Sequence, residues 1–360
     1  MALAAQAAIE TGELPGEAIE GIAQKHAALH ITKEQYSVVG EHLLGAIRDL
    51  LTDDQDVLDA WGELYGDIAS IFVQREAEIT KEVTSLPGSW EGRRTFVLDN
   101  KEPQSADITR YRFRPKDGKP TPAFEAGKYT TIWVPIEGKG PYGTFHEQPR
   151  HYTLAVPRKE QDANNSLSIS VKKQGLVSAE LEKAPIGAEF DFSTPFGVFV
   201  MSGVEQLWLS PEETPVVLIS AGVGLTPVLA MLENIYVTRP ATWLHVSRDG
   251  SIHAYNDRLR EIAAVREGEL QRRVWYSNPT DEDGPPGIET ETDPVKFNMA
   301  PYHYRGRMDL LQDNFNKDIL HLDKKDTNYF MCGPEKFMDN MKEALVKLGV
   351  DEGRIHWEGF

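Results

Sequence analysis

The sequence has little of several features that would assign it to particular classes of protein. Cys332 is the only cysteine among 360 residues, so no internal disulfide can form and a reducing, cytoplasmic location is expected. Basic residues are few: 38 lysines and arginines face 56 aspartates and glutamates, and the formal net charge of −18 argues against nucleic acid as a partner. No apolar run approaches the roughly 20 residues that span a bilayer, and no signal-peptide pattern opens the chain, so we expect no membrane insertion.

The spacing of apolar residues changes twice along the chain, and these changes predict three domains. Up to about residue 84 the spacing is helical. Between 85 and 209 it alternates in short strands separated by Pro and Gly, which is typical of an antiparallel barrel or sandwich. From 210 onward strands alternate with helices, which indicates a parallel α/β domain. The helices predicted in the first part are 2–9, 18–29, 34–51 and 54–79, and the strands predicted in the last are 216–220, 242–246, 273–277 and 328–332.

The stretch 215–232 is the most informative part of the α/β region. Its four apolar residues 216–219 predict a buried parallel strand. Gly222 and Gly224, on either side of Val223, then allow a sharp turn, and Thr226 and Pro227 begin a helix. A helix N-terminus that follows a glycine turn favours a phosphate, because its free N–H groups and its dipole both attract an anion. The segment 278–304 is rich in Pro, Gly and acids, and we expect it to be an exposed excursion.

A second group of motifs lies in the barrel region. Residues 150–153 read Arg-His-Tyr-Thr, and this tetrad on a strand resembles the flavin-binding signature of the ferredoxin-reductase superfamily. Taken alone it would also fit an ordinary strand with exposed polar residues. The resemblance extends to a phosphate-binding turn and a nicotinamide-side turn. The residues that would contact FAD or NAD(P)H are Tyr129, Arg150, His151, Tyr152, Thr153, Gly175, Val177, Ser178, Gly222, Val223, Gly224, Thr226, Pro227, Cys332, Gly333 and Pro334.

Motifs at both ends of the chain resemble one family within that superfamily, the flavohaemoglobins. They are residues 22–26, 34–36, 39–44, 59–62, 75–79, 90–92 and 355–360. The resemblance implies a multidomain fold with a partial all-α globin at 1–84, an antiparallel β-barrel FAD domain at 85–209 and an α/β parallel-sheet NAD(P) domain at 210–360. It also implies FAD, NAD(P)H and haem b as cofactors. The implied activity is that of a nitric oxide dioxygenase, which turns NO and O2 into nitrate.

Individual roles follow from the same resemblance. His26 matches the proximal ligand of the haem iron, and Tyr36 and Glu78 match the pair that hydrogen-bonds to its other ring nitrogen. Lys25 matches a lysine at the haem edge that faces the flavin. At the other end, Glu358 would lie beside the hydride path, and Phe360 would cover the flavin face.

Arg248 follows the second predicted strand of the α/β domain, where an arginine can meet the 2′-phosphate of NADP. Asp249 is adjacent, and an acid at this place would instead hold the ribose of NAD. We therefore expect NADH to be preferred, with some use of NADPH.

The sequence departs from the family pattern at its start, because it begins inside the expected distal helix and lacks the family's distal tyrosine and glutamine. The chain is then either a fragment of a longer protein or a short form that holds haem weakly. In the second case an apolar stripe would be exposed, and a dimer or a partner chain would cover it. The alternative function is a haem-free, FAD-dependent NAD(P)H reductase. The stripe comprises Leu43, Ile47, Trp61 and Ile68.

Overall fold

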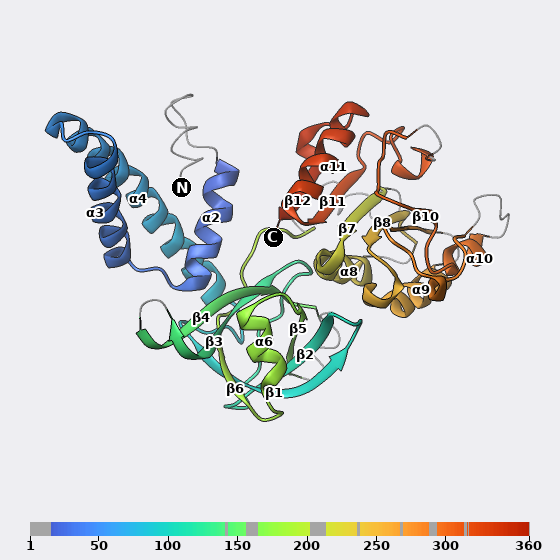
Figure 1. Cartoon of the computed structure of the whole chain (residues 1–360), viewed down its shortest axis with the longest axis horizontal. Helices are drawn as coiled ribbons and strands as arrows, with labels where there is room; N and C mark the ends of the chain where they lie inside the picture. The colour runs from blue at the N-terminus through green and yellow to red at the C-terminus, as the bar shows by residue number, and fades with distance from the viewer. Residues whose placement is uncertain are drawn as a thin grey trace.

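The computed structural model shows three domains, as the sequence predicts: a helical unit, an antiparallel sheet and a parallel sheet (Figure 1). The helical unit and the parallel sheet lie on the same side of the antiparallel one. The predicted helix 2–9 and Phe360 lie outside the described residues. The structure describes residues 16–140, 143–155, 165–201, 214–235, 238–266, 269–287, 294–312, 315 and 317–359.

The helical unit consists of α2 (Gly16–Leu29), α3 (Lys33–Leu50) and α4 (Gln55–Thr84). Thr32 begins α3 with a capping box, in which its side chain and that of Gln35 each accept from the other's backbone N–H. Helix α4 extends five residues beyond its predicted end, and its buried side chains recur at helical spacing. These side chains are Leu58, Ile68, Phe72, Glu76, Ile79 and Val83.

The expected exposed stripe on the helical unit is wrong for two of its four residues. Ile47 and Ile68 are buried, because α2, α3 and α4 pack against one another. Trp61 is half-buried, whereas Leu43 is 38% exposed. The other large apolar side chains exposed on α3 and α4 and between them are Val38, Val39, Leu50, Leu51, Val57 and Ile71.

The second domain is a six-stranded antiparallel sheet in the order β4-β3-β6-β1-β2-β5. An isolated bridge between Leu154, just after β4, and Ile169 of β5 joins the two edge strands, so the sheet closes into the predicted barrel. Alternate side chains fill its interior, and helix α6 (Leu176–Lys183) follows β5. The strands are β1 (Arg94–Pro103), β2 (Ile108–Pro115), β3 (Tyr129–Gly140), β4 (Gly143–Thr153), β5 (Leu167–Lys172) and β6 (Glu189–Phe192).

The third domain is a six-stranded parallel sheet in the order β10-β9-β8-β7-β11-β12. The chain first moves outward from β7 and then returns to its other side with β11, so the strand order reverses between these two strands. Ligands of open parallel sheets bind at such a reversal. The strands are β7 (Val216–Ala221), β8 (Ala241–Ser247), β9 (Leu270–Tyr276), β10 (Tyr304–Arg305), β11 (Asn328–Gly333) and β12 (Ile355–Gly359), and the helices are α8 (Leu225–Asn234), α9 (Asn256–Val265), α10 (Pro294–Met299) and α11 (Glu335–Lys347).

The expectation of an exposed excursion at 278–304 is wrong for its second half. Helix α10 and the residues after it pack on β9, where Tyr302 and His303 are buried. The cause is Arg272 of β9, which is fully buried and needs acceptors for its guanidinium. It donates to the backbone carbonyls of residues 298, 300 and 301, so this segment is held inside the domain.

The helical unit sits directly on the barrel. Tyr129 of β3 and Phe196 pack in one apolar cluster with α2 and α4. Gln24 of α2 accepts a hydrogen bond from the backbone N–H of Gly197 at 3.1 Å, and the ring of His30 stacks on Trp133. His30 is thus a residue of the interface between the helical unit and the barrel. Within the ranges that the structure describes, no helix is long and apolar enough to cross a membrane.

Candidate functional site

The described hydrogen bonds of the His26 side chain are all made by one of its two ring nitrogens, Nδ1. Its Nδ1 lies 2.7 Å from the hydroxyl of Tyr36 and 2.8 Å from Oε1 of Glu76, and Tyr36 also donates to that carboxylate. Burial and the neighbouring Glu76 raise the pKa of Tyr36, so its hydroxyl stays a donor. Nε2 makes no hydrogen bond within the described part of the chain, and the side chain is 24% exposed. A ring anchored through one nitrogen with the other free is the arrangement of a metal-ligating histidine.

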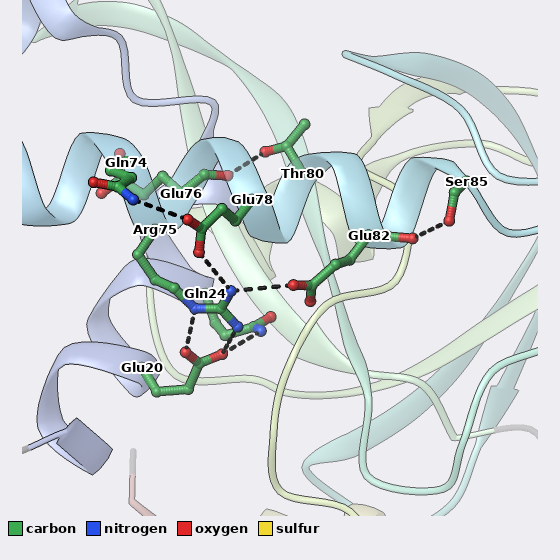
Figure 2. Close-up of polar contacts among 9 residues, drawn as sticks. All are labelled: Glu20, Gln24, Gln74, Arg75, Glu76, Glu78, Thr80, Glu82 and Ser85. Atoms are coloured by element: carbon green, nitrogen blue, oxygen red, sulfur yellow. Dashed lines mark hydrogen bonds and ion pairs between the residues drawn. The ribbon is translucent and has the colours of Figure 1, made fainter.

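The predicted carboxylate partner of His26 was wrong: it is Glu76 and not Glu78. Figure 2 shows Glu78 directed, with Glu20 and Glu82, toward the guanidinium of Arg75. Glu78 is half-exposed, and hydrogen bonds from Gln74 and Arg75 lower its pKa. Arg75 in turn connects α4 to Glu20 of α2, six residues before His26. Glu78 therefore helps to hold the helix of His26 without touching the histidine.

Tyr129 and His151 lie side by side on β3 and β4, with ring centroids 4.9 Å apart. The hydroxyl of Tyr129 is buried and has no hydrogen-bond partner among the described residues. His151 contacts the hydroxyl of Thr131 through Nδ1 at 2.9 Å, and burial together with the charges of Lys25 and Arg150 lowers its pKa to about 4. This neutral, largely buried pair offers polar atoms to a ligand that the protein itself does not satisfy.

Three other residues predicted to bind the flavin lie next to this pair on β4. Burial raises the pKa of Tyr152 to about 12, and its ring packs against the barrel core. Thr153 lies opposite Tyr129 in the strand register. Arg150 is exposed, and its Nη1 donates to the carbonyl of Pro149 at 2.7 Å.

The predicted phosphate-binding turn of the barrel precedes α6. Gly175 is the N-cap residue of this helix, and Val177 is buried in the barrel core. The hydroxyl of Ser178 accepts from the backbone N–H groups of Gln174 and Gly175 and donates to the carbonyl of Gly175. Ser178 thus stabilises the backbone of the turn.

The predicted nucleotide turn, Gly222–Gly224, follows β7. Gly222 has φ +54°, a left-handed conformation that a side chain would strain. A Cβ on Gly224 would lie 2.3 Å from the carbonyl oxygen of Cys332, so only glycine lets this turn approach the end of β11. Val223 lies between them, and Thr226 and Pro227 are buried in the first turn of α8. Two predicted turns, far apart in sequence, therefore meet where the strand order reverses.

Ionisable residues from two domains, the parallel-sheet domain and the helical unit, lie near this meeting point. Glu358 lies opposite Cys332 in the register of β12 and β11, and Gly333 and Pro334 follow directly. Burial raises the pKa of Glu358, and the charge of Lys25 on α2 opposes this shift. Burial and the charge of Glu358 also raise the pKa of Cys332, so its thiol stays protonated and serves as a packing residue. Lys25 is exposed.

Arg248 and Asp249 follow β8. The guanidinium of Arg248 pairs with Asp249 at 2.9 Å, and its side chain is 60% exposed. The carboxylate of Asp249 also accepts from the backbone N–H and the hydroxyl of Ser251. The carboxylate of Asp249 therefore accepts from both Arg248 and Ser251, whereas the guanidinium of Arg248 has further N–H donors that bond to no other residue in the described part of the chain.

Three family models match the chain in this order: Globin over residues 2–72, Oxidoreductase FAD-binding domain over 95–201, and Oxidoreductase NAD-binding domain over 218–343. A flavohemoprotein of Rhizobium meliloti is 33% identical over 98% of this chain and 82% of that protein. The chain belongs to the flavohaemoprotein family. The cofactors predicted from the sequence, FAD, NAD(P)H and haem b, are those of this family's domains.

Solved structures agree with this assignment. The flavohemoglobin of Malassezia yamatoensis with bound FAD and haem has a TM-score of 0.74 and 25% identity, and the match covers 100% of this chain and 83% of that one. The FAD/NAD-binding domain of a nitric oxide dioxygenase from Vibrio cholerae has a TM-score of 0.56 and 27% identity, over 74% of this chain and 98% of that one. A ferredoxin NADP+ reductase from Neisseria gonorrhoeae, 16% identical with a TM-score of 0.55 over 74% of this chain and 98% of that one, shares the fold alone.

The residues present fit the cofactors of a flavohaemoprotein. The free Nε2 of His26 suits haem iron, because its other nitrogen is already fixed by Tyr36 and Glu76. The unpartnered hydroxyl of buried Tyr129 suits the polar edge of a flavin ring. Sequence reasoning missed two contributors, Glu76 and Thr131. Glu76 could have been found from its place on the buried stripe of α4, whereas nothing in the sequence marks Thr131.

Proposed function

We propose that this chain is a nitric oxide dioxygenase that oxidises NAD(P)H and converts NO and O2 to nitrate. The observation that carries this proposal is the anchoring of His26 by both Tyr36 and Glu76, because a reductase without haem has no use for it. For each NADH, two NO and two O2 become two nitrate ions, with release of NAD+ and one proton. When bound, FAD would supply hydride acceptance and single-electron transfer, and haem iron would supply the site for the chemistry of O2 and NO.

The protein's own residues bind and orient these groups. The turn at Gly222–Gly224 and the N-terminus of α8 would hold the pyrophosphate of the nucleotide. Tyr129 and His151 would contact the flavin ring from the barrel. Glu358 comes from the parallel-sheet domain and Lys25 from the helical unit, and the charge of Lys25 opposes the rise in the pKa of Glu358.

On the globin side, Tyr36 and Glu76 act on the histidine. A carboxylate that accepts from Nδ1–H raises the electron density of the ring and fixes its tautomer. His26 can then donate more strongly through Nε2. This push favours the O–O chemistry that nitrate formation requires.

The haem-free reductase predicted as the alternative has weaker support. It needs the two nucleotide-binding domains, which are present, but it leaves the His26–Tyr36–Glu76 cluster unexplained. The two functions share the transfer of hydride to flavin and differ in every later step.

The test measures both activities in one preparation. The purified chain is supplied with haem and FAD, and NADH-dependent NO consumption is followed with an electrode beside NADH-dependent dye reduction. We expect both activities, with a Soret band in the visible spectrum. His26→Ala should abolish NO consumption and leave dye reduction within about twofold. Flavin absorbance alone, or NO consumption that survives in His26→Ala, would contradict the proposal.

A further inference from the structure

Tyr255 has a backbone conformation that its side chain does not favour. Its φ is +57° and its ψ is +17°, in the left-handed region, directly before the first residue of α9. Glycine or asparagine would supply this backbone at lower cost. A tyrosine here indicates that its side chain makes a contact the domain needs.

That contact crosses from the parallel-sheet domain to the barrel. The hydroxyl of Tyr255 lies 2.5 Å from the hydroxyl of Ser170 on β5, and Ser170 is buried. Burial raises the pKa of Tyr255 to about 12, so the phenol keeps its proton throughout the neutral range. The ring itself packs against the apolar core of the parallel-sheet domain.

The loop that carries Tyr255 is fixed within its own domain. Gly250 donates its backbone N–H to Asp283 at 2.8 Å, and His253 contacts the hydroxyl of Tyr276 at 2.9 Å. Because the loop is held at both points, a hydrogen bond made by Tyr255 constrains the position of the whole domain. The same loop begins at Arg248, directly after β8.

The barrel side of the contact also lies near the nucleotide turn. Strand β5 lies against the turn Gly222–Gly224, so Ser170 and this turn share one junction. A backbone hydrogen bond from Ala106 to the carbonyl of Ser251, at 2.9 Å, crosses the same junction, and Ile108 of the barrel enters the core of the other domain. Among these crossing contacts, the Tyr255–Ser170 pair is made by two side chains and can be removed without disturbing the backbone.

We propose that the hydrogen bond between Tyr255 and Ser170 sets the distance between the barrel and the nucleotide turn, so that hydride transfer depends on it. Both are positioning residues: neither is placed to touch the reacting atoms, and each acts through the orientation of a domain. The rate of such a reaction depends strongly on the distance between the reacting groups, since a displacement of about 1 Å can lower the rate by about 100-fold. The inference rests on the hydride step of the proposed function and on none of the haem chemistry.

The experiment measures flavin reduction in the full chain loaded with FAD. Anaerobic stopped-flow mixing with increasing NADH gives a limiting rate of flavin reduction and an apparent Kd for NADH. We expect Tyr255→Phe and Ser170→Ala each to lower the limiting rate about 10-fold, with an NADH Kd within about threefold and FAD content unchanged. The double variant should be no slower than either single one, because both remove the same contact. Ser170→Thr keeps the hydroxyl and should retain most of the rate.

Tyr329→Phe is the matched control. It removes another buried tyrosine hydroxyl of the same domain, whose hydrogen bond to the carbonyl of Leu320 stays far from the junction. Its limiting rate should equal that of the unchanged chain. If Tyr255→Phe does not fold, Ser170→Ala and Ser170→Thr decide the question from the barrel side.

Three results would overturn the inference. They are limiting rates within twofold of the unchanged chain, additive losses in the double variant, and a loss confined to the NADH Kd. A chain that reduces its flavin but consumes no NO would contradict the proposed function and leave this inference standing. The two failures are therefore distinguishable.

Discussion

Glu76 and His26 lie 2.8 Å apart, although 50 residues separate them in the chain. The carboxylate comes from the last third of α4 and the imidazole from the last turn of α2, and Tyr36 at the start of α3 bonds to both. All three described helices of the globin part thus meet at one nitrogen. The orientation of His26 is therefore a property of how these helices pack, and a change in that packing should be felt at the histidine.

Glu76→Gln tests this relationship. An amide keeps the shape of the side chain but removes the charge, so the imidazole of His26 becomes less electron-rich. Mutation of the residue that hydrogen-bonds to a metal-ligating histidine typically lowers metal affinity or activity about 10- to 100-fold. We expect a loss of NO consumption in that range. The reduction potential of the haem iron should shift upward, because a weaker donor stabilises the ferric state less.

Glu78→Gln is the control for that variant. Its carboxylate forms an ion pair with Arg75 at the protein surface, and such a pair contributes about 0–1 kcal/mol to the free energy of unfolding. We expect NO consumption within twofold and a small loss in urea stability. A larger effect on the iron potential from Glu78→Gln than from Glu76→Gln would contradict the assignment.

The choice between these two glutamates shows where sequence reasoning failed and how it could have succeeded. The motif placed a carboxylate within 75–79, and both Glu76 and Glu78 satisfy that. The apolar positions Phe72 and Ile79 mark the buried stripe of α4, and Glu76 lies four residues after the first and three before the second. A helix places such positions on one face, whereas Glu78 lies off it.

Other features could not be read from the sequence at all. The three domains and the two glycine turns follow from local signals, namely periodicity and turn residues. The burial of the segment after α10 depends on Arg272, whose guanidinium has to find carbonyl acceptors inside the protein. Tyr255 and Ser170 meet because two domains dock. Such contacts depend on tertiary geometry, and no local pattern predicts them.

Arg150→Ala should purify with little FAD. Arg150 is exposed beside the Tyr129–His151 pair and is the barrel residue predicted to bind the flavin pyrophosphate. A hydrogen bond to a charged group contributes about 1.5–3 kcal/mol, so FAD affinity should fall roughly 10- to 100-fold. Arg114→Ala is the control, because this arginine lies on the same barrel and pairs with Asp99. Equal flavin content in the two purified variants would show that Arg150 does not bind FAD.

The nucleotide preference depends on Arg248 and Asp249. Burial alone would raise the pKa of Asp249, but hydrogen bonds from Arg248 and Ser251 hold this pKa below its usual value. We expect NADH to be preferred, with some NADPH use that falls about 10-fold in Arg248→Gln, because the free donors of the guanidinium can reach a 2′-phosphate. Asp249→Asn should raise NADPH use by releasing Arg248. Rates of dye reduction at equal cofactor concentrations test this, and a strong NADPH preference in the unchanged chain would refute it.

Acidification should lower the stability of the parallel-sheet domain, and this loss should begin at a pH above the range in which carboxylates titrate. Burial lowers the pKa of His245 to about 3, and burial together with the charges of His245 and Arg272 lowers that of His253 well below its usual value. Unfolded histidines have a pKa of about 6.5. Above that pH both states are neutral and stability is full, and below it the unfolded chain takes up protons that the folded domain refuses.

The free energy of unfolding should therefore fall between pH 6.5 and pH 5 by up to about 1.4 kcal/mol per pH unit for each such histidine. The groups that face His253 are Arg272 and Arg260, which are charged, and His245 and His303, which would add charge if protonated, and all four oppose the protonation of His253. Urea unfolding at these two pH values, followed by the fluorescence of buried Trp243 and Trp275, measures the loss. His253→Phe should reduce the slope of the free energy of unfolding against pH by about the contribution of one histidine. His42→Asn, at an exposed position on α3, should leave this slope unchanged. An equal pH dependence in His253→Phe and the unchanged chain would mean that the buried imidazole is not responsible.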